Sequence, residues 1–127
     1  MLQIGIVPRD LERSLRFYRD TLGLNYVGAR PVIEGRVLHL FDCDGGILKL
    51  LQLPPGVPTP ANESPPAPFQ SATGMRWATM NVEDIDWYID RCGQACVQVP
   101  VTEIRPGLRM AIVEDPDGNA IELVERH

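Results

Sequence analysis

The sequence predicts an α+β fold in which two βαβββ modules pair into a curved, half-open barrel with the helices outside. Three observations predict this fold. The same order of strand-like and helix-like segments occurs twice, a Pro-rich stretch separates the two occurrences, and residues of the two halves match at one constant offset. Because neither half carries enough apolar residues for a core alone, we expect the two sheets to cover each other.

The first module, about residues 1–53, opens with an apolar strand-like run at residues 2–7. Asp10 follows at a helix N-cap position, and Gly23 supplies a stop signal for the helix. Between them, apolar residues recur at steps of four and three, which places them on one helical face. These residues are Leu11, Leu15, Tyr18 and Leu22.

Three strands complete this module. β-prone segments at about residues 26–30 and 36–41 are followed by the turn Asp-Cys-Asp-Gly-Gly at residues 42–46 and a strand at residues 47–53. The stretch at residues 54–74 is dense in proline and small polar residues, so we expect a stiff, extended connection.

The second module, about residues 75–127, repeats this order. A strand at residues 75–82 precedes Asp84, a helix cap, and Gly93 ends the helix. The helix is expected to bury the side chains of Ile85, Tyr88, Ile89 and Cys92. Strands at about residues 97–101, 108–113 and 120–124 follow, the last after the turn Asp-Pro-Asp-Gly-Asn at residues 115–119.

The two hairpin turns correspond residue by residue. Asp42, Asp44, Gly45 and Lys49 fall opposite Asp115, Asp117, Gly118 and Glu122 at one offset. Chance recurrence of a common turn is the alternative. An internal repeat is favoured because the helices and first strands correspond as well.

Charge and composition exclude several classes of partner. With 44% hydrophobic and 23% charged residues the chain is typical of a globular protein, and no apolar run approaches the ~20 residues that span a bilayer. A net charge of -5 disfavours a nucleic-acid partner. No basic region followed by an apolar run opens the chain, so we expect a cytoplasmic protein.

The chain has 3 cysteines, which do not make a disulfide framework. Cys92 and Cys96 lack the second pair of ligands that a structural zinc site needs. We interpret the thiols as packing residues. A redox pair or a metal site is the alternative.

The opening and the ending of the chain carry a family resemblance. The sequences IGIV at residues 4–7, DLERSLRFY at 10–18 and LGL at 22–24 resemble the opening of glyoxalase and bleomycin-resistance proteins. The sequence DPDGNAIELV at residues 115–124 is similar to their ending. The chain thus resembles the vicinal-oxygen-chelate superfamily over essentially its whole length. That fold hosts isomerases, epimerases, dioxygenases, thiol transferases and drug-binding proteins, so function is argued from the site.

The resemblance implies four positions for a divalent metal, which fall here on Gln3, Lys49, Trp77 and Glu122. Gln3 and Glu122 offer oxygen atoms that can ligate. Lys49 stands where a carboxylate is usual, and a charged ammonium has no lone pair. Trp77 stands where His is usual, and its indole N–H only donates. We therefore expect no cofactor, with a divalent metal as the less favoured alternative.

Lys49 is expected to replace the positive charge of the metal and to pair with Glu122, with Gln3 supplying a hydrogen bond. The alternative is that Lys49 extends its ammonium group into solvent at the mouth of the cavity.

Other residues are expected to share this cavity. Trp77 is either a stacking platform for an aromatic ligand or a core-filling residue. Strand alternation adds Thr79 and Leu51 to the lining. His39 is either a general base or a structural histidine, and Arg109 is a weaker candidate of the same kind.

Three functions compete at this point. The favoured one is a metal-free protein that sequesters a hydrophobic or aromatic small molecule, such as an antibiotic, as a homodimer. The alternative is a glyoxalase-like lyase, isomerase or dioxygenase that uses Glu122 as base with a divalent metal or Lys49 as electrophile. A structural domain without a ligand gains little support from the sequence.

Overall fold

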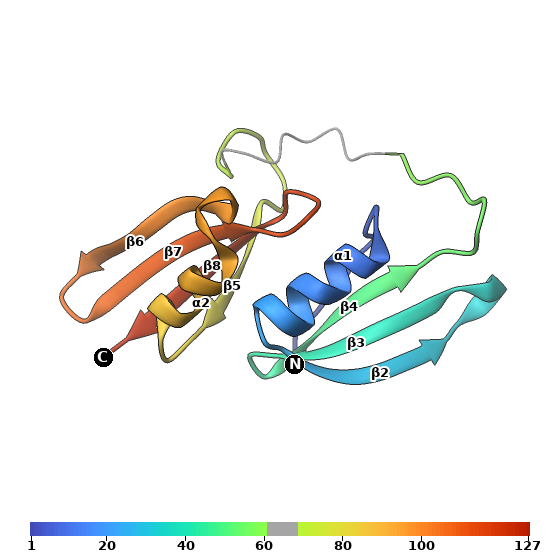
Figure 1. Ribbon diagram of the computed structural model, residues 1–127, viewed down its shortest axis with the longest axis horizontal. Helices are drawn as coiled ribbons and strands as arrows, with labels where there is room; N and C mark the ends of the chain where they lie inside the picture. The colour runs from blue at the N-terminus through green and yellow to red at the C-terminus, as the bar shows by residue number, and fades with distance from the viewer. Residues whose placement is uncertain (61–68) are drawn as a thin grey trace. The chain divides into compact units, whose positions relative to one another are not determined.

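A computed structural model describes residues 1–60 and 69–127 (Figure 1). The chain divides into two compact units, Met1–Ala61 and Asn62–His127. Unit 1 runs from blue to green in Figure 1, and unit 2 runs from yellow to red. The two units are described one at a time.

Unit 1 is a four-stranded mixed sheet with one main helical segment. Its elements are β1 (Gln3–Ile6), α1 (Leu11–Leu15), η1 (Arg16–Thr21), β2 (Asn25–Pro31), η2 (Ile33–Gly35), β3 (Val37–Cys43) and β4 (Gly46–Gln52). The strand order is β1-β4-β3-β2, with β1 parallel to β4 and the other pairs antiparallel.

Unit 2 repeats this topology. Its elements are β5 (Trp77–Asn81), α2 (Ile85–Cys92), η3 (Gln94–Cys96), β6 (Val97–Arg105), β7 (Leu108–Glu114) and β8 (Ala120–Arg126). The strand order is β5-β8-β7-β6, with β5 parallel to β8. The α+β class and the two βαβββ modules are therefore confirmed. The pairing of the two sheets into a half-open barrel concerns the two units together and stays a prediction.

The helices begin where the sequence predicts. The Asp10 side chain accepts a hydrogen bond from the backbone N–H of Arg13, and Asp84 accepts one from that of Trp87. Each carboxylate satisfies a donor that the first helical turn leaves unpaired. Gly93 ends α2 with a φ of 77°, a left-handed value that glycine adopts without strain.

The first helix differs from the prediction in its geometry. The α-helical turn ends at Leu15, and residues 16–21 continue as a π-helix. This wider stretch holds Phe17 and Tyr18, which are consecutive, both buried, and packed edge to face at 5.1 Å between ring centroids. Tyr18 also contacts Phe41 of β3, so the helical segment covers the face of the sheet that carries Phe41.

Each unit has a buried layer between its helix and its sheet. In unit 1, Tyr18, Leu22, Phe41 and Leu50 are at most 1% exposed. In unit 2, Ile85 of α2 and the strand residues Ala111, Val113 and Leu123 are fully buried. We call the sheet face that carries the helix the helix face and the opposite one the inner face.

Strand register confirms the internal repeat. In unit 1, Gln3 pairs with Ile47 and Gly5 pairs with Lys49. In unit 2, Trp77 pairs with Ala120 and Thr79 pairs with Glu122. The same pairs of positions therefore face each other across the parallel strands of both units.

Part of the predicted connection at residues 54–74 lies outside the described residues, which stop at 60 and resume at 69. The described part includes a turn closed by a hydrogen bond from Val57 N–H to the Pro54 carbonyl. Within the described ranges, no helix is long and apolar enough to cross a lipid bilayer.

Candidate functional site

The inner face of unit 1 carries three residues of the predicted site. Lys49 alternates along β4 with the buried Leu48 and Leu50, so its side chain lies on the opposite, inner face. Leu51 lies two residues further on the same face, and Gln3 of β1 shares it through its partner Ile47. These three residues of the predicted lining thus share one face of the sheet of unit 1.

The inner face of unit 2 carries Trp77, Thr79 and Glu122. Thr79 and Glu122 are register partners, and the Thr79 hydroxyl donates to Glu122 Oε1 at 2.8 Å. The hydrogen bond fixes one oxygen of the carboxylate. The Lys49–Glu122 ion pair would join two units and stays a prediction.

Trp77 is 51% exposed, so it does not fill the core of unit 2. Phe69 lies edge-on to its indole, with ring centroids 5.3 Å apart and planes at 85°. Arg76 holds this segment, because its Nε–H donates to the Phe69 carbonyl at 3.0 Å. The indole is thus braced along one side while half of its surface remains exposed, which suits stacking of a flat ligand.

His39 lies on the helix face, away from Lys49. It stands two residues before Phe41 on β3, and Phe41 contacts Tyr18 of the helical segment. The Tyr26 hydroxyl is 2.9 Å from His39 Nδ1, and Gln52 Oε1 is 2.8 Å from Nε2. Nε2 therefore donates to the Gln52 oxygen, while Nδ1 shares a hydrogen bond with the Tyr26 hydroxyl. His39 and Lys49, which were expected to share one face, therefore lie on opposite faces of the sheet.

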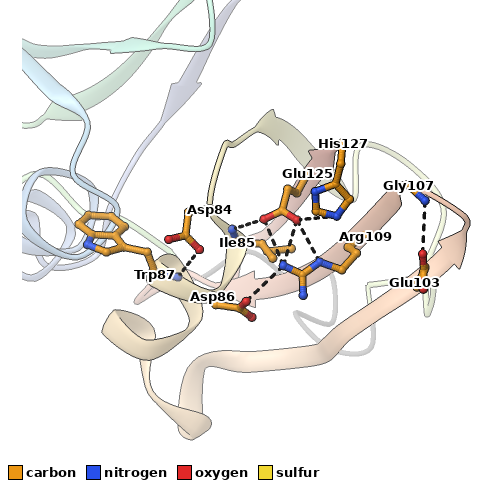
Figure 2. A network of polar contacts seen from close by, with 9 residues as sticks. All are labelled: Asp84, Ile85, Asp86, Trp87, Glu103, Gly107, Arg109, Glu125 and His127. Carbon is orange, nitrogen blue, oxygen red and sulfur yellow. Dashed lines mark hydrogen bonds and ion pairs between the residues drawn. The ribbon is translucent and has the colours of Figure 1, made fainter.

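Arg109 also lies on the helix face. It is the register partner of Glu125, and both side chains meet α2 (Figure 2). The Arg109 Nη2 atom lies 2.9 Å from Glu125 Oε1 and 3.2 Å from Asp86 Oδ2. Its guanidinium is paired with carboxylates of its own unit, on the face opposite Glu122.

Glu125 is the centre of this network. Its side chain is 4% exposed and accepts a hydrogen bond from the backbone N–H of Ile85 at 2.8 Å. His127 Nε2 lies 3.1 Å from its Oε1 (Figure 2). The pKa of this carboxyl is lowered below its usual value. The hydrogen bond from the Ile85 N–H is the largest cause and Arg109 adds to it, because both favour the charged form. The network fastens α2 to β7 and β8.

The residues at the four family metal positions do not fit a divalent ion. In unit 1, Lys49 offers donors and no lone pair beside Gln3. In unit 2, the Trp77 indole only donates, and one oxygen of Glu122 already accepts from Thr79. Each unit retains one residue able to ligate, while a catalytic metal site needs about three.

Sequence reasoning missed Glu114 and Gln98. Glu114 pairs with Ala120, which places its carboxylate on the inner face of unit 2, and Gln98 Nε2 donates to Glu114 Oε1 at 2.7 Å. The signal was present in the turn at residues 115–119, because the residues that flank a hairpin turn become cross-strand partners.

Comparisons with known proteins agree with this architecture. The model of the Glyoxalase/Bleomycin resistance protein/Dioxygenase superfamily matches residues 1–123. A search of curated proteins finds no match. The chain belongs to the Glyoxalase/Bleomycin resistance protein/Dioxygenase superfamily.

Three solved structures show how widely the fold is shared. A glyoxalase family protein from Bacillus cereus is similar with a TM-score of 0.81 at 23% identity, over 99% of this chain and 93% of that one. TnmS3, an antibiotic binding protein from Streptomyces sp. CB03234, gives 0.66 at 24% identity, over 98% and 93%. TioX from Micromonospora sp. ML1 gives 0.68 at 18% identity, over 100% and 96%. At these identities the likeness concerns the fold.

Proposed function

We propose that this protein binds and sequesters a hydrophobic or aromatic small molecule, without a metal ion. The observation that carries the proposal is the Trp77 indole, half exposed on the inner face of unit 2 and braced by Phe69. A large flat ring that is held in place but uncovered offers stacking area at little cost in conformational entropy. Thr79, Glu122, Gln3, Lys49 and Leu51 are the further ligand-binding residues that we propose.

The family and one solved structure of similar fold support this proposal. TnmS3, a protein of the same fold, is an antibiotic binding protein. The unfavourable donor set at the four metal positions also favours binding over the metal-dependent chemistry of other members. The lyase, isomerase or dioxygenase alternative requires Glu122 as a base, and nothing among the described residues favours it.

The chain contains 2 tryptophans, Trp77 and Trp87, which makes a matched test possible. Trp87 lies on α2, where the Arg91 guanidinium sits 4.4 Å from its ring centroid. We expect an aromatic ligand to quench the fluorescence of Trp87→Phe, whose remaining reporter is Trp77. Trp77→Phe, which keeps only Trp87, should lose this quenching and bind about two- to tenfold more weakly, since one stacked aromatic pair contributes roughly 0.5–1.5 kcal/mol beyond its buried area and the smaller ring keeps part of the stacking.

The test is a fluorescence titration of both variants with the same panel of planar aromatic compounds. Equal quenching in the two variants, or quenching only through Trp87, would refute the assignment of the site. A homodimer remains part of the proposal, and light scattering after size-exclusion chromatography measures it directly.

A further inference from the structure

A row of three residues crosses the inner face of unit 2. Trp77 of β5 pairs with Ala120 of β8, and Ala120 pairs with Glu114 of β7. Because register partners on adjacent strands point to the same face, the three side chains stand side by side, with neighbouring strands about 4.8 Å apart. The methyl group of Ala120 thus lies between the indole and the carboxylate. The backbones of β5 and β7, which carry these two groups, are about 10 Å apart.

The next row adds a second carboxylate. Glu122 follows Ala120 by two residues on β8, which is roughly 6.6 Å along the strand. Both carboxylates are held by neutral donors, Glu114 by Gln98 at 2.7 Å and Glu122 by Thr79 at 2.8 Å. The hydrogen bonds orient the two groups and leave their negative charges in place.

Four arginines of unit 2 have partners other than Glu114 and Glu122, and Arg105 of β6 pairs with Leu108 at the end of the sheet away from Ala120. Arg109 binds Glu125 and Asp86 on the helix face, Arg91 covers Trp87, and Arg76 binds the Phe69 carbonyl. Arg126 shares the inner face at the far end of β8 and donates to the Asn81 side chain. The row therefore combines an aromatic platform with negative charge, in a chain of net charge -5.

Unit 1 provides an internal comparison. The corresponding row there consists of Gln3, Ile47 and Asp42. It has no aromatic ring, its centre is occupied by the larger Ile47, and Asp42 accepts a hydrogen bond from Asn25 at 2.8 Å. The combination of ring, small residue and carboxylate is thus specific to the row of unit 2.

We propose that the ligand is an aromatic cation, whose flat ring stacks on Trp77 above Ala120 while its protonated amine or amidine pairs with Glu114 and Glu122. The proposal rests on the proposed function, since it names the chemical class of the sequestered molecule. Under this proposal Glu114 and Glu122 together recognise the positive charge of the ligand, and Glu114 is a specificity-determining residue.

The test compares three probes of one three-ring shape by isothermal titration calorimetry: 9-aminoacridine, which is cationic at neutral pH, neutral acridine, and anionic acridine-9-carboxylate. We expect 9-aminoacridine to bind on the order of tenfold more tightly than acridine, and the anion to bind most weakly. The preference should shrink as salt is raised, since partly exposed charges are screened.

Glu114→Gln should remove most of the preference for the cation while leaving the affinity for acridine within about twofold. Asp90→Asn, which removes the same charge from the exposed side of α2, is the matched control and should leave the preference unchanged. Ala120→Ile, which copies the residue at the equivalent position of unit 1, should weaken all three probes about tenfold or more, and its circular dichroism spectrum verifies folding.

The outcomes separate this inference from the function on which it rests. If all three probes bind equally well through Trp77, sequestration stands and the preference for a cation is wrong. If Glu114→Gln and Asp90→Asn reduce the preference equally, the overall charge is responsible and the role of Glu114 is wrong. If no probe binds, both proposals fail together.

Discussion

Gly46 shows how a single residue can determine a local arrangement. A Cβ atom at this position would lie 2.2 Å from the Leu2 carbonyl oxygen, which is backbone and has little room to move. The same carbonyl accepts the hydrogen bond of Ile47 N–H at 3.1 Å, at the start of the parallel pairing between β1 and β4. Glycine at residue 46 therefore permits the chain start to approach the sheet.

We predict that Gly46→Ala lowers the free energy of unfolding by about 1–3 kcal/mol, the usual cost of forcing extra atoms into a packed position. Gly5→Ala is the matched control, because a Cβ there meets no atom within 4 Å. Urea unfolding monitored by circular dichroism measures both variants. If the two variants were equally stable, the close approach of the Leu2 carbonyl would not require glycine at residue 46.

At the scale of elements, the attachment of α2 depends on charge. Glu125 of β8 accepts from the first N–H of the helix, and Arg109 links it to Asp86 (Figure 2). The position equivalent to Glu125 in unit 1 is Gln52, which is neutral and binds His39 instead. The two units thus share one topology, but at this equivalent position unit 2 uses charged side chains and unit 1 uses neutral ones.

This difference predicts a pH dependence. The pKa of Glu125 is lowered from its ordinary 4.5 by the Ile85 N–H and Arg109, so its contribution to stability is fully present above pH 4.5 and is lost as the pH falls through the lower folded value. Glu125→Gln should therefore be less stable than the parent at pH 7, and the gap should narrow toward pH 3. Thermal unfolding at a series of pH values tests this. A gap independent of pH would contradict it.

At the scale of the whole molecule, local chemistry made the fold predictable. Asp10, Asp84 and Gly93 mark helix ends through their own hydrogen bonds or backbone freedom, so they act the same way in any context. The repeat was visible because the two hairpin turns have similar sequences and each follows the same order of strand and helix. The π-helical stretch at residues 16–21 carries no comparable sequence signal.

The site was less predictable, since it depends on which face of a sheet each residue occupies. His39 and Arg109 were placed by strand membership alone, and each lies on the helix face because of its register with β4 or β8. In unit 2 five residues separate the register partners Glu114 and Ala120, whereas in unit 1 four residues separate the partners Asp42 and Ile47. A shift of one residue exchanges the two faces of a strand, which composition alone does not reveal.

The most direct measurement of the central claim is a titration followed by nuclear magnetic resonance of the two indole N–H groups, with 9-aminoacridine as the ligand. An aromatic ligand stacked on the inner face of unit 2 should shift the Trp77 signal strongly, because ring currents act over a few ångströms, and should leave that of Trp87 nearly unchanged. A shift confined to Trp87, or no shift at either indole at saturating ligand, would contradict the account.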